Sequence, residues 1–151
     1  MTRHIFPYGI RFREDRQIEL FPAAEVLIEG RSNRGIRAVL HIDSGATLSV
    51  LPASDASQLG IPLSKGKKML VKGVSGESLP GYRHTVRVHV GEEKFNIPVV
   101  FVEHPNVPAI LGREGLFTSF AVVFDEARRR VAFLDGNTER KAIDALFPEH
   151  I

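Results

Sequence analysis

Cysteine is absent from this sequence of 151 residues. The chain therefore cannot form a disulfide, a thiolate zinc site or an iron–sulfur cluster, and it offers no cysteine nucleophile. Any chemistry that it performs must use carboxylates, hydroxyls, histidine or lysine. The length suits one domain with a single core and is too short for two full-sized domains.

Long apolar stretches and a strong excess of charge are also absent from the sequence. The first twenty residues hold no signal-like apolar stretch, and no later run approaches the ~18 apolar residues of a membrane span. Twenty Lys and Arg stand against eighteen Asp and Glu, a net charge of +2, and the basic residues lie in short groups beside turns. A nucleic-acid binder would gather them on one face. We expect a soluble cytoplasmic protein that binds neither nucleic acid nor membranes.

The remaining polar residues give no sign of a metal or cofactor site. The histidines lack the spacing of metal ligands, such as a pair at positions i and i+4. Ser75 lies in Gly-Val-Ser-Gly, which differs from the Gly-x-Ser-x-Gly motif of serine hydrolases. We therefore expect no metal, no cofactor and no serine nucleophile.

The sequence does contain many short apolar stretches separated by turn-forming residues, a pattern typical of mainly β domains. It predicts strands at 24–29, 36–42, 48–51, 68–74, 82–90, 95–102, 108–112, 120–124 and 131–134. Short helical segments are predicted at 53–59 and 113–119, and a C-terminal helix at 138–147 with Thr138 as its cap. Pro98 indicates an edge or a bulge in its strand.

The most informative residues follow the predicted strand 36–42. Asp43 stands at the end of this apolar strand, where a carboxylate is costly unless it is hydrogen-bonded. Gly45 lets the backbone turn sharply and bring its N–H close to that carboxylate, while Ser44 can brace the turn. Asp-Ser-Gly alone is also typical of a surface turn, so a turn or capping aspartate is the alternative interpretation of Asp43.

Three motifs together favour a particular family. They are Asp43-Ser44-Gly45-Ala46 after an apolar strand, a hairpin around the glycine-containing segment 72–76, and Ile110-Leu111-Gly112 before a short helical segment. In order and spacing, over about residues 26–133, they resemble the retropepsin-like aspartic proteases, a single-domain family that includes retroviral proteases and prokaryotic relatives. The resemblance implies a mainly β, closed β-barrel with one or two short helices, here followed by the C-terminal helix.

The same resemblance implies a role for each motif. The active-site loop would consist of the catalytic Asp43 with Ser44, Gly45 and Ala46, and Ser44 would tie the loops of two subunits together. The flap that closes over an extended peptide would consist of Gly73, Val74, Ser75 and Gly76. The segment supporting the active-site loop from below would consist of Ile110, Leu111 and Gly112.

Catalysis in this family needs two facing carboxylates that share one proton across a water molecule. The sequence contains one Asp-Ser/Thr-Gly motif, so the second carboxylate must come from Asp43 of another copy. We therefore predict an aspartic endopeptidase that acts on peptide or protein substrates as a homodimer. The alternatives are a catalytically silent dimerisation or peptide-binding module with the same fold, and a monomer that needs a partner or a larger precursor to dimerise.

The sequence also predicts how the chain is divided. We assign residues 1–20 to an N-terminal extension, 21–135 to the retropepsin-like protease domain and 136–151 to a C-terminal helical tail. Viral members of the family join their subunits through interleaved terminal strands. This chain has an extra N-terminal segment and a predicted terminal helix, so its contact between copies can differ from theirs.

Overall fold

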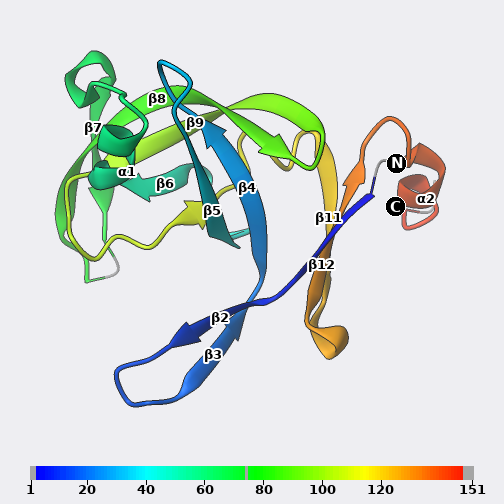
Figure 1. Cartoon of the computed structure of the whole chain (residues 1–151). Helices are drawn as coiled ribbons and strands as arrows, with labels where there is room; N and C mark the ends of the chain where they lie inside the picture. The colour runs from blue at the N-terminus through cyan, green and yellow to red at the C-terminus, as the bar shows by residue number, and fades with distance from the viewer. Residues whose placement is uncertain (1–2, 74, 148–151) are drawn as a thin grey trace.

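The computed structural model describes residues 3–73 and 75–147. Strands predominate, which confirms the mainly β class predicted from the sequence (Figure 1). The strands are β1 (Arg3–Pro7), β2 (Gly9–Phe12), β3 (Ile18–Phe21), β4 (Ala23–Glu29), β5 (Gly35–Ile42), β6 (Ser49–Pro52), β7 (Lys67–Lys72), β8 (Ser78–Val90), β9 (Glu93–Val102), β10 (Ile110–Leu111), β11 (Phe120–Asp125) and β12 (Arg130–Asp135). The helices are α1 (Ala53–Gln58) and α2 (Arg140–Asp144), with 3-10 turns η1 (Leu63–Lys65) and η2 (Glu126–Arg128).

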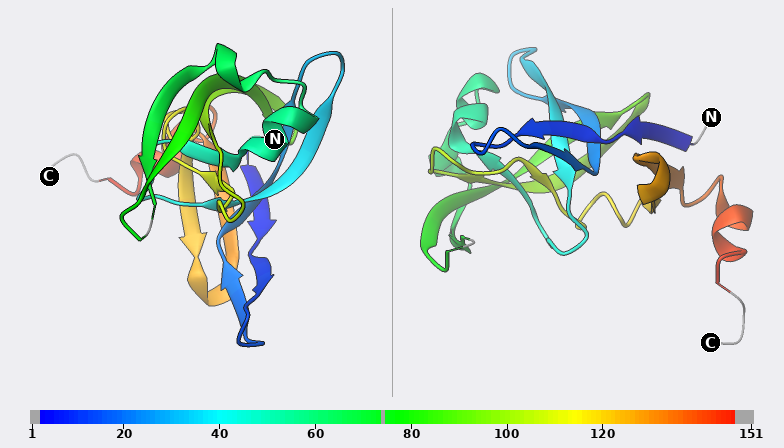
Figure 2. Two further views of the ribbon diagram at one scale, coloured as in Figure 1. Left: turned by 90° about the vertical axis from the view of Figure 1, so that its left-hand side faces the viewer. Right: turned by 90° about the horizontal axis from the view of Figure 1, so that it is seen from below.

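The main sheet has the strand order β4-β5-β10-β6-β9-β8-β7. Strand β4 also pairs with β8, with Leu27 opposite His89 and Ile28 opposite Val88, so the sheet closes on itself and β7 extends beyond the ring. Figures 1 and 2 show these strands curling around a common interior. The largest fully buried side chains in this part of the chain include Phe101, Ile28, Leu40, Leu51 and Ile97.

Strand β5 shows why this sequence forms a sheet with one buried face. Apolar residues at every second position place Leu40 and Ile42 in the core, while Val39 before them is exposed and His41 between them is only partly buried. This alternation is the period of a strand with one buried face. The strand ends at the buried Ile42, so Asp43 is the first residue after the core.

A second, three-stranded sheet joins the two ends of the chain in the order β1-β12-β11. Strand β1 runs antiparallel to β12, with Arg3 opposite Leu134 and Pro7 opposite Arg130. Strands β2 and β3 pair with each other in a separate hairpin that stands away from the rest of the molecule (Figure 1). Residues 3–21 therefore contain three strands, although the sequence predicts none there.

The structure corrects the predictions for strands β8 and β9. Strand β8 begins at Ser78, earlier than the predicted start at residue 82, because residues 78–83 pair with β7. Pro98 lies in an interior strand, since β9 runs between β6 and β8. The pairing with β6 starts only at Val99, so at Pro98 itself β8 is the paired neighbour.

The C-terminal helix is shorter than the sequence predicts and starts later, at Arg140. Thr138 does not cap it, because the Thr138 hydroxyl donates instead to Asp135 Oδ1 at 3.0 Å. The helix α1, in contrast, follows Pro52 as predicted, and Gly60 adopts a positive φ of 67° just beyond its end. None of the helices in the described part of the chain is long and apolar enough to cross a membrane.

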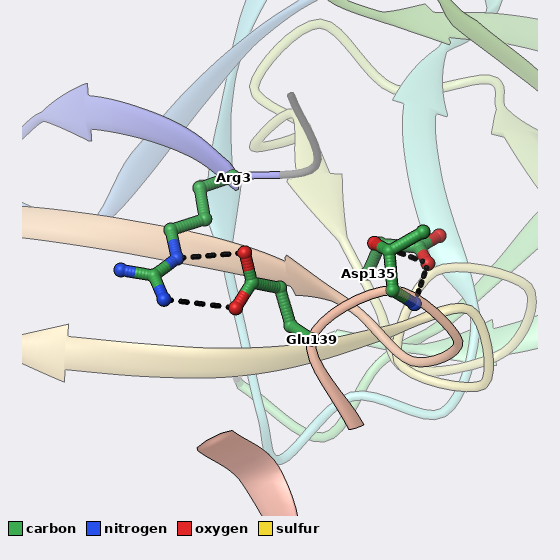
Figure 3. Close-up of polar contacts among 4 residues, drawn as sticks. Arg3, Asp135 and Glu139 are labelled. Carbon is green, nitrogen blue, oxygen red and sulfur yellow. Dashed lines mark hydrogen bonds and ion pairs between the residues drawn. The ribbon is translucent and has the colours of Figure 1, made fainter. Parts of the chain in front are cut away.

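Polar contacts hold the two ends of the chain together (Figure 3). The Arg3 guanidinium donates from Nε and Nη2 to the two carboxylate oxygens of Glu139, both at 2.8 Å. Beside this pair, Asp135 accepts from the backbone N–H and the hydroxyl of Thr138, and these hydrogen bonds hold the pKa of Asp135 below its usual value. The segment after β12 is thus bound to the β1–β12 sheet by charge-assisted hydrogen bonds.

Candidate active site

The Asp43 loop begins where β5 ends. The partly buried Asp43 carboxylate accepts a hydrogen bond at Oδ1 from the backbone N–H of Gly45, at 2.9 Å. The Ala46 N–H donates to the Asp43 carbonyl at 3.2 Å and closes the turn. Ser44 and Gly45 are exposed at its outer side. The backbone hydrogen bond that the sequence predicts from Gly45 is therefore present, and it orients the carboxylate.

The two-residue strand β10 fixes this loop from behind. Ile110 and Leu111 pair in parallel with His41 and Ile42, and the Asp43 N–H donates to the Leu111 carbonyl at 3.0 Å. Ile110 also pairs with Val50 of β6, on the other side of the loop. The segment predicted to support the active-site loop therefore lies between the two strands that flank it.

Gly112 lies where two backbone segments meet. A Cβ atom at this position would lie 2.5 Å from the carbonyl carbon and oxygen of Leu48, so a side chain would push the two segments apart. The Gly112 N–H donates to the Ser49 hydroxyl at 3.0 Å. Ser49 is only 1% exposed, and a buried hydroxyl of this kind must find a partner.

Ser49 is not among the site residues that the sequence predicts. The only sign of this role in the sequence is a serine at a position of β6 that the alternation of apolar residues predicts to be buried. Its partner is Gly112, far along the chain, and the contact becomes evident only when β10 is placed beside β6.

The residues after Gly112 clamp the far end of the Asp43 loop. The backbone N–H groups of Arg113 and Glu114 donate to the carbonyls of Ala46 and Thr47, both at 2.9 Å. The Phe117 N–H then donates to the Arg113 carbonyl at 2.9 Å, which is helical hydrogen bonding. The helical segment predicted at 113–119 is therefore present as consecutive turns rather than a regular helix.

The predicted flap is the turn between β7 and β8. These strands form the predicted hairpin, with Lys72 opposite Ser78 at its end. The Gly73 N–H donates to the Glu77 carbonyl at 2.8 Å, and the Gly76 N–H donates to the Gly73 carbonyl at 3.0 Å. Gly76 has a positive φ of 84°, a conformation that glycine adopts without the steric cost of a side chain. Of the predicted flap residues, Val74 lies outside the described residues.

A mainly apolar cavity of about 470 Å³ is lined by both the flap and the residues around the Asp43 loop. From the loop side and its support come Ala46, Val50 and Ile110. From the flap hairpin come Val71, Lys72, Gly73, Ser75, Glu77 and Leu79. The structure thus brings three of the predicted groups of site residues to one cavity. The lining also includes His104, Asn106 and Pro108, which are not among the predicted site residues.

A single chain contains one Asp-Ser-Gly loop, and the carboxylate that this loop carries is that of Asp43. Of the predicted residues of this loop and its support, those that do not line the cavity are Asp43, Ser44, Gly45, Leu111 and Gly112. Gly45 and Leu111 contact Asp43 through backbone hydrogen bonds, and Gly112 holds Ser49 on the far side of the loop. Within residues 3–73 and 75–147, no group of three or more His, Cys, Asp or Glu side chains is placed to hold a metal ion. The arrangement is a mainly apolar cavity that the Asp43 loop reaches through Ala46, three residues after the carboxylate that the Gly45 N–H orients.

Comparison with known proteins places the chain in a family. Residues 26–114, more than half of the chain, match the family model described as aspartyl protease. The protein therefore belongs to the aspartyl protease family. The matched residues include Asp43, the predicted flap turn and β10. A search of curated proteins found no match to the sequence.

Similar solved structures include two proteases. A retropepsin-like aspartic protease from Rickettsia conorii superposes with a TM-score of 0.60 at 18% identity, covering 87% of this chain and 98% of that chain. The EIAV protease in complex with the inhibitor HBY-793 matches at 23% identity with a TM-score of 0.46, over 62% of this chain and 82% of that chain. The first of these similarities shows that the protein has the retropepsin-like fold.

Proposed function

We propose that this protein is an aspartic endopeptidase that hydrolyses peptide bonds as a homodimer, with one Asp43 from each subunit. The observation that carries the proposal is the Asp43 carboxylate held by the Gly45 N–H, in a loop that β10 and Gly112 fix from behind. Membership of the aspartyl protease family supports the same chemistry. A single chain supplies half of the required carboxylate pair.

The proposed reaction uses one proton shared by two carboxylates. The ionised Asp43 takes a proton from water as the water oxygen bonds to the peptide carbonyl carbon, and the protonated Asp43 of the second copy donates to the carbonyl oxygen. The first carboxyl then gives its proton to the amide nitrogen as the C–N bond breaks. One hydroxyl on the former carbonyl carbon returns its proton to the Asp43 of the second copy. The products are a carboxylic acid and an amine, and the two carboxyl groups are back in their original protonation state.

The flap and the cavity are proposed to bind the substrate. An extended peptide between the flap and the Asp43 loop would add strand-like backbone hydrogen bonds, while its side chains enter apolar pockets. The cavity at Val50, Val71, Leu79 and Ile110 suits an apolar side chain. Gly73 and Gly76 give the flap turn its shape, and closing of such a loop over the peptide would exclude water.

The proposed mechanism predicts that activity is highest in acid and disappears when both Asp43 copies ionise, because no shared proton remains. A peptide-library digest at about pH 5 and about pH 8 measures this, with cleavage sites read by mass spectrometry. Cleavage should be strong in acid and weak in alkali. A rate that rises steadily through alkaline pH would contradict the mechanism.

Replacing Leu79 with alanine should change which peptides are cleaved. The substitution enlarges the cavity, so we expect selectivity for bulky over small apolar side chains to rise roughly 10-fold. The control is Leu70→Ala on the paired strand of the same hairpin, since Leu70 is 66% exposed and does not line the cavity. Equal changes in kcat/KM ratios for both variants would show that Leu79 does not contact the substrate.

A further inference from the structure

The hairpin formed by β2 and β3 has one apolar face that nothing in the described chain covers. Cross-strand pairing places Ile10 opposite Leu20 and Phe12 opposite Ile18, so these four side chains share a face. They are between 45% and 78% exposed. The hairpin stands away from the rest of the molecule in Figure 1.

The opposite face of the hairpin is already satisfied within the chain. Arg11 forms an ion pair with Glu19 at 3.6 Å, and its guanidinium lies 4.7 Å from the centre of the Phe21 ring. Phe21 itself is buried and packs beside Gly9. The two faces therefore differ, and only the one with Ile10, Phe12, Ile18 and Leu20 lacks cover. Exposed apolar clusters of this kind mark contact surfaces.

The base of the hairpin lies beside the catalytic loop. The Ile42 N–H, one residue before Asp43, donates to the carbonyl of Pro22 at 2.9 Å. The Phe21 ring lies 5.3 Å from the His41 ring, centre to centre. Any two-fold arrangement that brings two copies of Asp43 together therefore also brings the bases of the two hairpins close to the partner subunit.

The size of the apolar face argues against a partner of its own. Four residues of strand at ~3.4 Å each, on two neighbouring strands, make a footprint of roughly 14 Å by 10 Å. A stable interface needs about 800 Å² from each partner. This face alone is therefore too small for a stable interface, and the surface next to its base is the one that carries Ile42 and Asp43.

The charges of the hairpin favour the same occupant. Its positive side chains, Arg11, Arg13 and Arg16, are balanced by Glu14, Asp15 and Glu19. A neutral arm gains little from an anionic membrane or a nucleic acid, both of which attract basic segments. Two such arms also approach each other without net repulsion.

We propose that the β2–β3 hairpin is a dimerisation arm whose apolar face, formed by Ile10, Phe12, Ile18 and Leu20, packs on a second copy of this chain. This inference rests on the proposed function, because the second copy is the one that supplies the other Asp43. The hairpin strengthens the contact that completes the catalytic pair.

Sedimentation of the full chain over a range of concentrations tests the arm. Wild type should form a species of twice the 16.8 kDa chain mass, and the double variant Phe12→Glu, Ile18→Glu should weaken dimerisation about 100-fold, since it buries charges in an apolar contact. The control is Leu146→Glu, because Leu146 lies outside the arm and is as exposed as Ile18, 62% against 63%. This variant should dimerise as wild type does.

A second measurement does not depend on a destabilising change. Because the chain lacks cysteine, Ile10→Cys can be labelled at one place with a photoreactive maleimide, and irradiation should give a covalent dimer, whereas labelled Leu146→Cys should not. A wild-type chain that stays monomeric, or a double variant that dimerises like wild type, would overturn the inference. Dimers that need the arm but cleave no peptide at any pH would instead overturn the proposed function alone.

Discussion

Asparagine at position 43 is expected to reduce peptide cleavage by about 1000-fold or more, because an amide can neither take a proton from water nor share one with a second carboxylate. The fold should be unaffected. The amide oxygen of asparagine can still accept the hydrogen bond that the Gly45 N–H donates to Asp43 Oδ1. Initial rates on one peptide at the acid optimum, with thermal unfolding measured in parallel, give both results.

The matched control is Asp144→Asn, which also removes one carboxylate. Asp144 lies on α2 in an exposed pair with Arg140, so its loss should change neither activity nor stability appreciably. If Asp43→Asn retained the wild-type rate while Asp144→Asn behaved as expected, the catalytic role of Asp43 would be refuted and the non-catalytic module with the same fold would be favoured.

Alanine at Gly112 should damage both stability and activity. The new Cβ would lie 2.5 Å from the backbone carbonyl of Leu48, a contact that cannot be relieved by turning a side chain. Overpacking of this kind costs about 1–3 kcal/mol, which lowers Tm by roughly 2–10 °C for a chain of this size. Separation of Gly112 from the Leu48–Ser49 backbone also shifts the loop that carries Asp43, so cleavage should fall more than stability alone explains.

Gly136→Ala is the matched control for this change. A Cβ atom at Gly136 would lie 3.4 Å from the nearest atom, the Ser119 carbonyl oxygen, and the residue has no positive φ. This variant should unfold close to the wild-type temperature and cleave at the wild-type rate. Equal Tm values and rates for both alanine variants would contradict the role assigned to Gly112.

The sequence predicts the parts of the fold whose signals are local. The alternating residues of 36–42 predict β5, and Gly45 predicts the hydrogen bond to Asp43 that the structure contains. The glycines around 73–76 likewise predict a hairpin turn, which β7 and β8 confirm. In each case the residues that specify the geometry are neighbours in the chain.

Features that depend on distant partners could not be predicted in this way. Strand β1 pairs with β12 at the other end of the chain, and its few apolar residues carry no pattern of their own. Ser49 and Gly112 meet only through the placement of β10 beside β6. Thr138 has the right chemistry for a helix cap, but the carboxylate of Asp135 competes for its hydroxyl.

The absence of cysteine takes on a sharper meaning at the site. It leaves carboxylates and water as the chemistry that fits, and the chain presents one such carboxylate, Asp43, on a loop that its own backbone fixes. The proposed function therefore requires a second copy to complete the catalytic pair.

The most direct test of that claim is the activity of a fixed amount of wild-type chain mixed with increasing amounts of the Asp43→Asn variant, after time for subunits to exchange. If each active site needs Asp43 from two chains, an equal mixture should keep about half of the wild-type activity, and excess variant should reduce it towards zero. Activity that stays constant however much variant is added would show that one chain is sufficient, and would contradict the account.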